Sequence, residues 1–149
     1  MKININIKIT NKNIPYPKYT TTGSSALDLH ANINKPIQIK PKNTVLIPTG
    51  IAIHISDPNI TAIIIPRSGL GHYHGIILGN TIGLIDSDYQ GEIKLSIWNR
   101  NNKTYTIQPH ERIAQIIFFP IIRVKFNLIK SFKNRTKRNN KGFGHSGKI

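Results

Sequence analysis

Cysteine is absent from this chain of 149 residues. Its absence excludes disulfides and thiolate metal sites, and it fits a protein of a reducing compartment. The sequence also lacks an apolar run near the length of about 18 residues or more that a membrane-spanning helix needs. It shows no charged-then-apolar leader segment. We therefore expect a soluble cytoplasmic protein with no membrane partner.

Acidic residues are few: six Asp and Glu stand against 21 Lys and Arg, so the formal net charge is +15. A positive field attracts phosphates. The basic residues are spread out, however, without the interleaved aromatic rings of a platform for single-stranded nucleic acid. The abundant Ile, Asn and Lys are residues that A- and T-rich codons specify, so mutational drift can supply part of the charge. We do not expect nucleic acid as a partner, whereas a small phosphorylated ligand would use the same field.

No window holds a sustained helical stripe of apolar residues. Short apolar or alternating segments recur instead at intervals of roughly 8–12 residues, which is typical of an all-β sandwich or barrel. One helical turn is predicted over residues 68–74. We expect one β domain over residues 1–130, followed by a basic tail over residues 131–149 that has no acidic residue. The predicted strands include residues 2–9, 26–31, 51–55, 60–65, 104–107, 113–119 and 123–129.

Three of the six acidic residues, Asp86, Asp88 and Glu92, lie in the stretch of residues 78–100. Apolar residues precede the two aspartates and a clean alternation follows them, so the sequence predicts a hairpin with both aspartates in its turn. Glycines punctuate its arms, as they do where a strand bulges or where a group must approach the backbone closely. The aspartates then either accept local N–H bonds in an ordinary turn or form a functional site.

Two further clusters could bind phosphate. Residues 66–69 (PRSG) follow a predicted strand and could cradle a phosphate; the alternative is a Ser N-cap beside a solvent-facing Arg67. Arg112 and Gln115 are three residues apart in a predicted strand, so we expect them on opposite faces, with at most one of them facing any given site.

The remaining chemistry-bearing residues give weaker signals. Residues 142–147 (GFGHSG) place three glycines around Phe143 and could cover a ligand, or simply form a disordered end. Asp28 lies inside a predicted strand, where its carboxylate must find partners or stay at a margin. His72 and His74 lie two residues apart with no cysteine nearby, which is not a metal-ligand pattern.

Taken together, these segments resemble the five ordered motifs of the trimeric deoxyuridine triphosphate nucleotidohydrolases, the dUTPases. The resemblance covers essentially the whole chain with compatible spacing, and IDSDYQG and GFGHSG are long matches. The five segments are the ALDL sequence around Asp28, residues 66–69, residues 83–91 with Asn80 upstream, residues 111–115 (ERIAQ) and residues 142–147.

The resemblance implies a role for each matching residue. Asp86 is the catalytic residue that positions and activates the water attacking the α-phosphorus; a carboxylate with an ordinary pKa is ionised at pH 7 and can accept its proton. Asn80 and the main chain around Leu84 and Ile85 meet uracil, and Tyr89 packs under the deoxyribose, where it crowds out a 2′-hydroxyl. The other implied substrate-binding residues are Arg67, Ser68, Gly69, Gln115, Lys94, Arg138 and Phe143.

The resemblance also implies a fold, an assembly and a cofactor. The family is a jelly-roll-like β-barrel or sandwich, the dUTPase-like β-clip, and forms a homotrimer in which each site is shared between chains and the flexible C-terminal tail of one chain closes over another's pocket. It hydrolyses dUTP to dUMP and pyrophosphate, which supplies dUMP for dTTP synthesis and keeps uracil out of DNA. Mg²⁺ would be held by the triphosphate and waters, with no ligand directly from side chains.

Three departures from the family pattern stand out. Ala26 occupies a position that usually holds glycine, residues 139–141 (NNK) interrupt the glycine-rich run of the last motif, and Arg135 rivals Arg138 as the arginine of the tail. The alternatives to a dUTPase are a dCTP deaminase of the same fold and a non-catalytic module that binds nucleotides or polyanions. The intact central motif favours dUTP hydrolysis.

Overall fold

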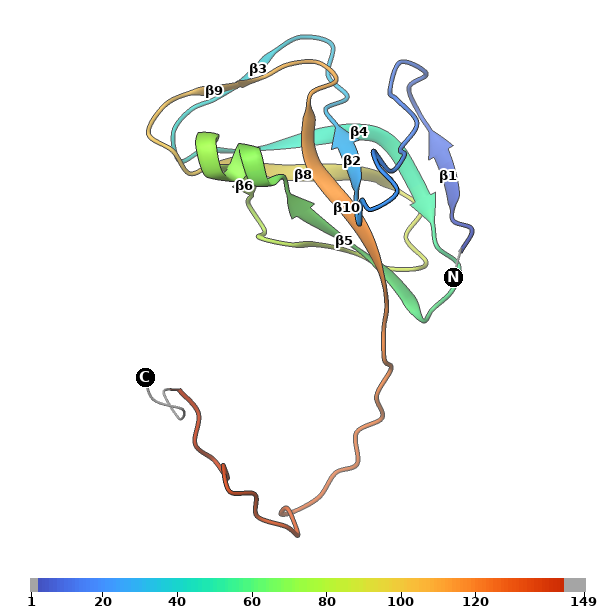
Figure 1. Cartoon of the computed structure of the whole chain (residues 1–149), viewed down its shortest axis with the longest axis vertical. Helices are drawn as coiled ribbons and strands as arrows, with labels where there is room; N and C mark the ends of the chain where they lie inside the picture. The colour runs from blue at the N-terminus through green and yellow to red at the C-terminus, as the bar shows by residue number, and fades with distance from the viewer. Residues whose placement is uncertain (1–2, 144–149) are drawn as a thin grey trace.

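Two antiparallel sheets of four strands face each other in the computed structural model, which describes residues 3–143 (Figure 1). The first sheet has the order β1-β4-β8-β6 and the second the order β2-β10-β5-β7, while β3 and β9 form a separate two-stranded ribbon. This arrangement agrees with the all-β sandwich that the strand spacing predicts. The first sheet consists of β1 (Asn6–Ile9), β4 (Thr44–His54), β8 (Glu92–Asn99) and β6 (Ile76–Leu78). The others are β2 (Leu27–His30), β10 (Arg112–Pro120), β5 (Ile60–Pro66) and β7 (Gly83–Ile85), with the ribbon formed by β3 (Ile37–Ile39) and β9 (Tyr105–Ile107).

The core lies between the two sheets and is built mainly from isoleucine and leucine. Strand β8 shows how the sequence produces it: Ile93, Leu95 and Ile97 are buried on one face, while the intervening residues face outward. Each such side chain contributes about 1.5–3 kcal/mol when it is removed from water. Buried Asn99 ends this strand, and its amide donates to the carbonyl oxygens of Ile39 and Lys103, so its polarity is satisfied.

The helical turn predicted over residues 68–74 is present, and its final part, η1 (Leu70–His74), is a single π-helical turn. Gly75 ends it with φ of +66°, a conformation that glycine adopts without the steric cost of a side chain. Leu70 is buried and fixes the turn to the core. No helix in the described part of the chain is long and apolar enough to cross a membrane.

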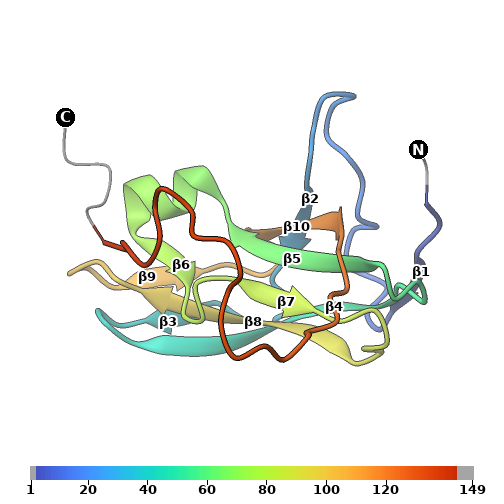
Figure 2. The same cartoon turned by 90° about the horizontal axis from the view of Figure 1, so that it is seen from below.

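The predicted central hairpin is wrong in one respect, because its two arms do not pair with each other. Strand β7 pairs with β5 in the second sheet, whereas β8 pairs with β4 and β6 in the first. Residues 86–91 therefore carry the chain from one sheet to the other (Figure 2). Alternation identifies the face of a strand that is buried, but it does not identify the neighbouring strand.

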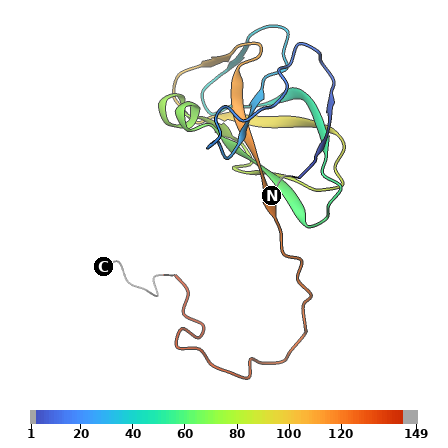
Figure 3. The ribbon, with the colours of Figure 1, turned by 45° about the vertical axis from the view of Figure 1, so that its right-hand side comes forward.

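Residues 121–143 form an arm that leaves the body of the molecule (Figures 1 and 3). Every residue of this arm is exposed, and the strand predicted over residues 123–129 does not form. The alternation is real in the sequence, but in a single chain its apolar side chains find no surface to cover. Two hydrogen bonds tie the start of the arm to the β4–β5 turn, from the Ile121 N–H to the Asn59 carbonyl oxygen and from Arg123 Nε to the Pro58 carbonyl oxygen.

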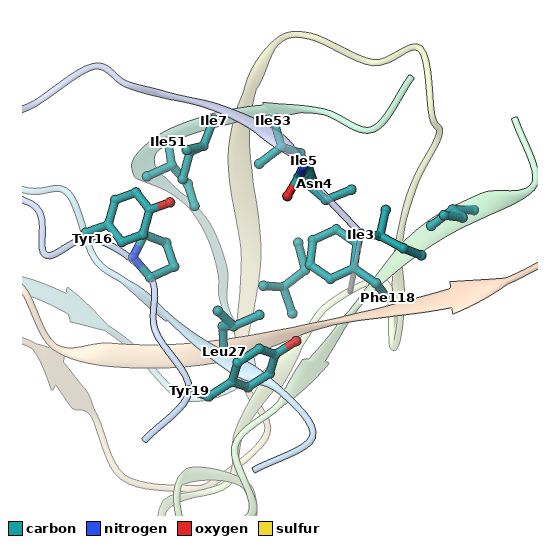
Figure 4. A pocket seen from close by; sticks show the side chains of 13 residues that line it. Ile3, Asn4, Ile5, Ile7, Tyr16, Tyr19, Leu27, Ile51, Ile53 and Phe118 are labelled. Carbon is teal, nitrogen blue, oxygen red and sulfur yellow. The ribbon is translucent and has the colours of Figure 1, made fainter. Parts of the chain in front are cut away.

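An apolar cavity of about 540 Å³ lies where the edge strand β1 approaches the second sheet (Figure 4). Ile5 and Ile7 line one side of it, the rings of Tyr16 and Tyr19 another, and Phe118 of β10 lies on a third. None of the residues implied in nucleotide binding lines this cavity. It is therefore a separate apolar surface of the single chain.

Candidate active site

Asp28 on β2 holds together the side chains of Arg112 and Gln115 on β10 and of Arg67, which is far from them in the sequence. Its Oδ1 atom accepts from Arg67 Nε at 3.1 Å and from Gln115 Nε2 at 3.3 Å, and its Oδ2 atom accepts from Arg112 Nη1 at 3.1 Å. The Asp28 side chain is 13% exposed, so these partners satisfy a largely buried carboxylate. Two arginines around one carboxylate leave a net positive charge, which is suited to binding phosphate oxygens.

The expectation that Arg112 and Gln115 face opposite sides of β10 is wrong. Arg112 pairs with His30 and Ala114 pairs with Leu29, which are adjacent residues of β2. Ile113 therefore has no partner on β2 and is an extra residue on β10, which makes a β-bulge. A bulge of this kind shifts the alternation by one residue. Gln115 then pairs with Asp28 and comes to lie on the same face as Arg112.

Arg67 begins the segment that leads from β5 into the helical turn. It also donates from Nη1 to the Arg112 carbonyl oxygen at 3.2 Å, so it is fixed at two points rather than turned to solvent. The helical turn has no side-chain cap hydrogen bond at its start. The alternative of a Ser N-cap beside a solvent-facing arginine therefore does not hold, and Ser68 and Gly69 remain exposed next to the charged cluster.

The turn after β7 is closed by main-chain groups and leaves its two aspartates exposed. The Tyr89 N–H donates to the Asp86 carbonyl oxygen at 3.2 Å, and the Ser87 carbonyl oxygen accepts from the Ser56 N–H at 3.1 Å. Among the described residues, the Asp86 carboxylate has no hydrogen bond, whereas Asp57 in another turn accepts from the Asn59 N–H. Asp86 is thus free to meet a ligand or a water, which favours a site over an ordinary turn.

Strand β7 lies at the end of its sheet and pairs with β5 alone. Successive residues of a strand point their main-chain groups to alternate edges, and the Ile85 carbonyl oxygen accepts from Thr61 Oγ1 of β5. The main-chain groups of Leu84 therefore face the free edge and are available to a ligand. Asn80 is exposed in the loop between β6 and β7, which is anchored by the Gly79 N–H donating to the Ser96 carbonyl oxygen at 2.7 Å. An open strand edge beside an exposed amide offers the donors and acceptors that a base edge requires.

Within one chain, the charged cluster and the aspartate turn are not brought together. Ile85, just before Asp86, pairs with Ala62, whereas Arg67 follows the far end of the same strand. Because a strand rises about 3.3 Å per residue and Arg67 follows Ala62 by five residues, the two groups are at least about 17 Å apart along β5. One α-phosphorus cannot contact both groups of a single chain.

Three of the implied residues lie apart from both groups. Lys94 is exposed on β8, on the face of the first sheet that points away from the core. Arg138 and Phe143 lie in the exposed arm, where Arg138 donates to the Lys141 carbonyl oxygen and Asn139 has φ of +50°. Residues 144–149, including the remainder of the GFGHSG motif, lie outside the described residues.

Two titratable groups near the charged cluster have displaced pKa values. Burial lowers the pKa of His30; Asp28 opposes this effect, while Arg112, His110 and Arg67 lower the pKa further. Burial also raises the pKa of Tyr105, whose hydroxyl donates to the Glu111 carboxylate. Both groups are therefore neutral at pH 7, and they add no charge to the cluster.

No group of three His, Asp or Glu side chains gathers as a metal site within residues 3–143. Asp86 and Asp88 are exposed in the turn after β7, whereas the Asp28 carboxylate is occupied by Arg67, Arg112 and Gln115. Such a donor set fits a cation that arrives with the phosphates and keeps several of its waters, as Mg²⁺ commonly does.

The dUTPase family model matches residues 12–147 of the chain, which includes both the charged cluster and the aspartate turn. The chain belongs to the dUTPase family. A deoxyuridine 5′-triphosphate nucleotidohydrolase of Buchnera aphidicola (subspecies Acyrthosiphon pisum, strain Tuc7) is 57% identical over 148 residues, covering 97% of this chain and 96% of the relative. An Escherichia coli protein of the same description (strain K12 / DH10B) is 53% identical and covers 97% of each chain.

Among solved structures, a dUTPase variant of Staphylococcus bacteriophage 80alpha with dUpNHpp is similar to this dUTPase chain. The TM-score is 0.85 with 21% sequence identity, and the match covers 97% of this chain and 98% of the phage chain. At this identity the likeness shows the dUTPase fold alone. It confirms the jelly-roll-like all-β fold that the resemblance in the sequence implied.

Sequence reasoning missed two features of this dUTPase site. It did not place Arg112 beside Gln115, because the bulge that brings them together has no glycine or proline to mark it. It also did not identify Asp28 as the partner of Arg67, although a carboxylate inside a strand was the signal that such partners must exist. Both features depend on pairing between β2 and β10, which lie more than eighty residues apart.

Proposed function

We propose that this chain hydrolyses dUTP to dUMP and pyrophosphate. The observation that carries the proposal is the exposed Asp86 carboxylate on a turn held by main-chain bonds, in a chain of the dUTPase family. In the reaction a water oxygen attacks the α-phosphorus, and the bond from that phosphorus to the bridging oxygen breaks. Pyrophosphate then leaves in line with the attacking water.

Asp86 acts as the general base that takes a proton from the attacking water. Its carboxylate is exposed and has no other partner among the described residues, so it can accept that proton directly. The turn fixes the direction of the carboxylate, because Ser87 and Ile85 are both bonded through their carbonyl oxygens, to Ser56 and Thr61. Positioned general bases of this kind contribute about 10²–10⁴-fold to a rate.

The cluster around Asp28 binds phosphate oxygens. Asp28 orients the Arg67 and Gln115 side chains through Nε and Nε2. Arg67 Nη1 also donates to the Arg112 carbonyl oxygen, so Arg67 Nη2 and the second N–H of the Gln115 amide are left to reach a ligand. Ser68 and Gly69, exposed beside them, add a hydroxyl and a main-chain N–H. Side chains that are already oriented lose less entropy when the triphosphate binds.

Base and sugar are recognised by β7 and the turn that follows it. The open edge of β7 and the Asn80 amide bond the edge of uracil. A base that lies this close to main chain would have no room for the methyl group of thymine. Tyr89, 43% exposed, presents its ring to the deoxyribose. Lys94 contributes one further contact, and Phe143 and Arg138 contact the base and the γ-phosphate when the arm closes.

The active assembly is a homotrimer with sites shared between chains. Two observations support it: the separation of at least about 17 Å between Asp86 and Arg67 along β5, and the large apolar surfaces that one chain leaves uncovered. These surfaces are the cavity beside β1 and the arm, in which Ile122, Phe126 and Leu128 are at least 90% exposed. Exposed apolar surface of this extent is typical of an interface.

Mg²⁺ is the proposed cofactor. A dUTPase variant from phage phi11 of S. aureus, with a TM-score of 0.78 and 16% identity over 88% of this chain and 99% of that chain, is described as revealing the coordination of a structural Mg(II) ion. In the present chain the ion would be held chiefly by the triphosphate and waters, and it would neutralise charge on the phosphates. The cytoplasmic location and the supply of dUMP for dTTP synthesis stay predictions from the sequence.

The test is a product analysis with dUTP, dCTP and dTTP, each incubated with Mg²⁺ and the protein. We expect dUMP and pyrophosphate from dUTP and little turnover of the other two. Asp86→Asn should reduce dUTP turnover at least tenfold while it retains nucleotide binding, whereas the matched variant Asp57→Asn, at an aspartate that is not assigned to the site, should not. Deaminated dCTP would instead indicate the deaminase of the same fold, and nucleotide binding without turnover would indicate a non-catalytic module.

A further inference from the structure

The ring of Tyr89 lies directly over Gly91, two residues further along the same turn. A Cβ atom at position 91 would stand 2.6 Å from Tyr89 Cζ and 3.0 Å from Cε2, which is closer than real Cβ contacts. The backbone of Gly91 is not in the left-handed region, so other residues could adopt its conformation. Position 91 therefore favours glycine because the tyrosine ring occupies the space that a side chain would need.

The ring is also fixed at its tip. The Tyr89 hydroxyl donates to the Glu92 carbonyl oxygen at 3.1 Å, so the side chain folds back along the chain toward the start of β8. Glu92 is in turn fixed to the neighbouring strand, because its Oε1 atom accepts from the Gly50 N–H at 2.8 Å. The hydroxyl end of the ring is thus held against residues 91 and 92, where β8 begins, while the side chain remains 43% exposed.

We propose that Gly91 is a positioning residue that determines sugar specificity, because it provides the seat on which the Tyr89 ring rests. This inference rests on the proposed function, in which Tyr89 packs against the deoxyribose. A ring that excludes a 2′-hydroxyl by contact must not move away when a ribonucleotide arrives. The bare main chain of Gly91 and the Glu92 carbonyl oxygen together hold the ring in place against such a displacement.

A methyl group at position 91 should displace the ring and break the bond from its hydroxyl to Glu92. The displaced side chain can then rotate about χ1 and yield to a 2′-hydroxyl. We expect Gly91→Ala to raise the ratio of kcat/KM for UTP to kcat/KM for dUTP about tenfold, the scale at which a pocket discriminates one small group. The ratio should change because kcat/KM falls for dUTP and rises for UTP, while the stability of the fold changes little.

The kinetic experiment compares four variants with the wild type: Gly91→Ala, Tyr89→Ala, the double variant and Gly23→Ala. Gly23 is the matched control, because it lies in an exposed loop and a Cβ there would meet nothing within 4 Å. If Gly91 acts through Tyr89, the double variant should have the same UTP-to-dUTP ratio as Tyr89→Ala. Gly23→Ala should keep the wild-type ratio. An unchanged ratio in Gly91→Ala, or additive effects in the double variant, would overturn the proposal.

A second measurement does not depend on activity. In protein with ¹³C-labelled tyrosine, the NMR signals of the Tyr89 ring, assigned through Tyr89→Phe, should shift in Gly91→Ala and stay in place in Gly23→Ala. Unshifted signals in Gly91→Ala would refute the proposal that Gly91 positions the Tyr89 ring. If the signals shift in Gly91→Ala but the wild-type protein does not hydrolyse dUTP, Gly91 positions the Tyr89 ring and the proposed function is wrong.

Tyr89→Phe keeps the test decisive if Gly91→Ala does not fold. This variant retains the ring and loses only its bond to the Glu92 carbonyl oxygen. Loss of one such hydrogen bond should raise the UTP-to-dUTP ratio about fivefold. An unchanged ratio would show that the ring needs no anchor, and the proposal would then be wrong.

Discussion

Among single residues, Asp28 has the largest number of charged partners in the described part of the chain, since both ion pairs found there involve it. Asp28→Asn keeps the shape of the side chain but removes the charge that orients Arg67 and Arg112. The two guanidinium groups would then repel each other beside a neutral amide. We expect a loss of about 1–3 kcal/mol in the free energy of unfolding and a rise of about tenfold in KM for dUTP. Chemical denaturation and steady-state kinetics measure the two effects.

Asp57→Asn is again the control, because Asp57 accepts only local bonds from Asn59. An Asp28→Asn variant that matched this control in both stability and KM would show that the cluster does not depend on the carboxylate. The sequence indicated that Asp28 needs partners, but it could not name them, because they come from β10 and from the connection after β5, both far from Asp28 in the sequence.

His30 gives the fold a dependence on pH. Its pKa is lowered in the folded protein, chiefly by burial, so the unfolded chain binds a proton more readily than the folded one. The neutral form therefore stabilises the fold above the unfolded pKa of about 6.5. This stability is lost as the pH falls below that value.

We expect the melting temperature to decrease between pH 7.5 and pH 5.5 less steeply in His30→Gln than in the wild type. His72→Gln, in the exposed part of the helical turn, should retain the wild-type slope. Equal slopes in the His30 variant and the wild type would mean that other groups produce the acid sensitivity.

At the scale of elements, the strands and the helical turn were largely predictable, and their partners were not. The predicted segments 60–65, 104–107 and 113–119 differ from β5, β9 and β10 by one residue or less at either end. Alternation and turn residues are local signals, and they are sufficient to locate a strand. The pairing of β7 with β5 and the bulge in β10 depend on long-range packing, which leaves no comparable mark in the sequence.

The bulge in β4 is a second irregularity that the fold requires, and it lies where β4 passes β8. The register shifts between Pro48 and Ala52, and Gly50 there has φ of +72°. A Cβ atom on Gly50 would stand 2.7 Å from Ile14 Cγ1, so both the backbone and the available space favour glycine.

Gly50→Ala should lower the free energy of unfolding by about 1–3 kcal/mol, the cost of holding a non-glycine residue in a strained conformation. Gly23→Ala serves as the matched comparison for the loss of a glycine. Denaturation midpoints measured side by side give the difference. If both variants unfolded at the same denaturant concentration, the conformation of Gly50 would not contribute to stability.

For the whole molecule, the arm is predicted to act as a lid rather than as part of the core. Beyond Thr136 its contacts are confined to local turns, such as the bond from the Lys141 N–H to the Arg138 carbonyl oxygen. Truncation after Thr136 should therefore leave the melting temperature nearly unchanged. It should reduce dUTP turnover at least tenfold, because closure aligns the phosphates and excludes water.

Melting and turnover are measured on the same preparation of the truncated protein. Full activity would show that the lid is unnecessary, and a large fall in melting temperature would show that the tail is structural. The left-handed conformation of Asn139 suggests how the arm accommodates the residues that interrupt the glycine-rich run, since asparagine tolerates positive φ better than most residues.

The central claim is that each active site takes Asp86 from one chain and the cluster around Arg67 from another. It can be tested by mixing two inactive variants, Asp86→Asn and Arg67→Ala, after unfolding and refolding them together. Light scattering should first show a trimer for each variant alone. In random mixed trimers a site with both wild-type groups occurs in about one case in four, because each group is intact in half of the chains.

We therefore predict that the mixture recovers about a quarter of wild-type dUTP turnover, although each variant refolded alone remains inactive. If every site lay within one chain, no mixture of these two variants could contain an intact site. Turnover of the mixture equal to the average of the two separate variants would contradict the shared site.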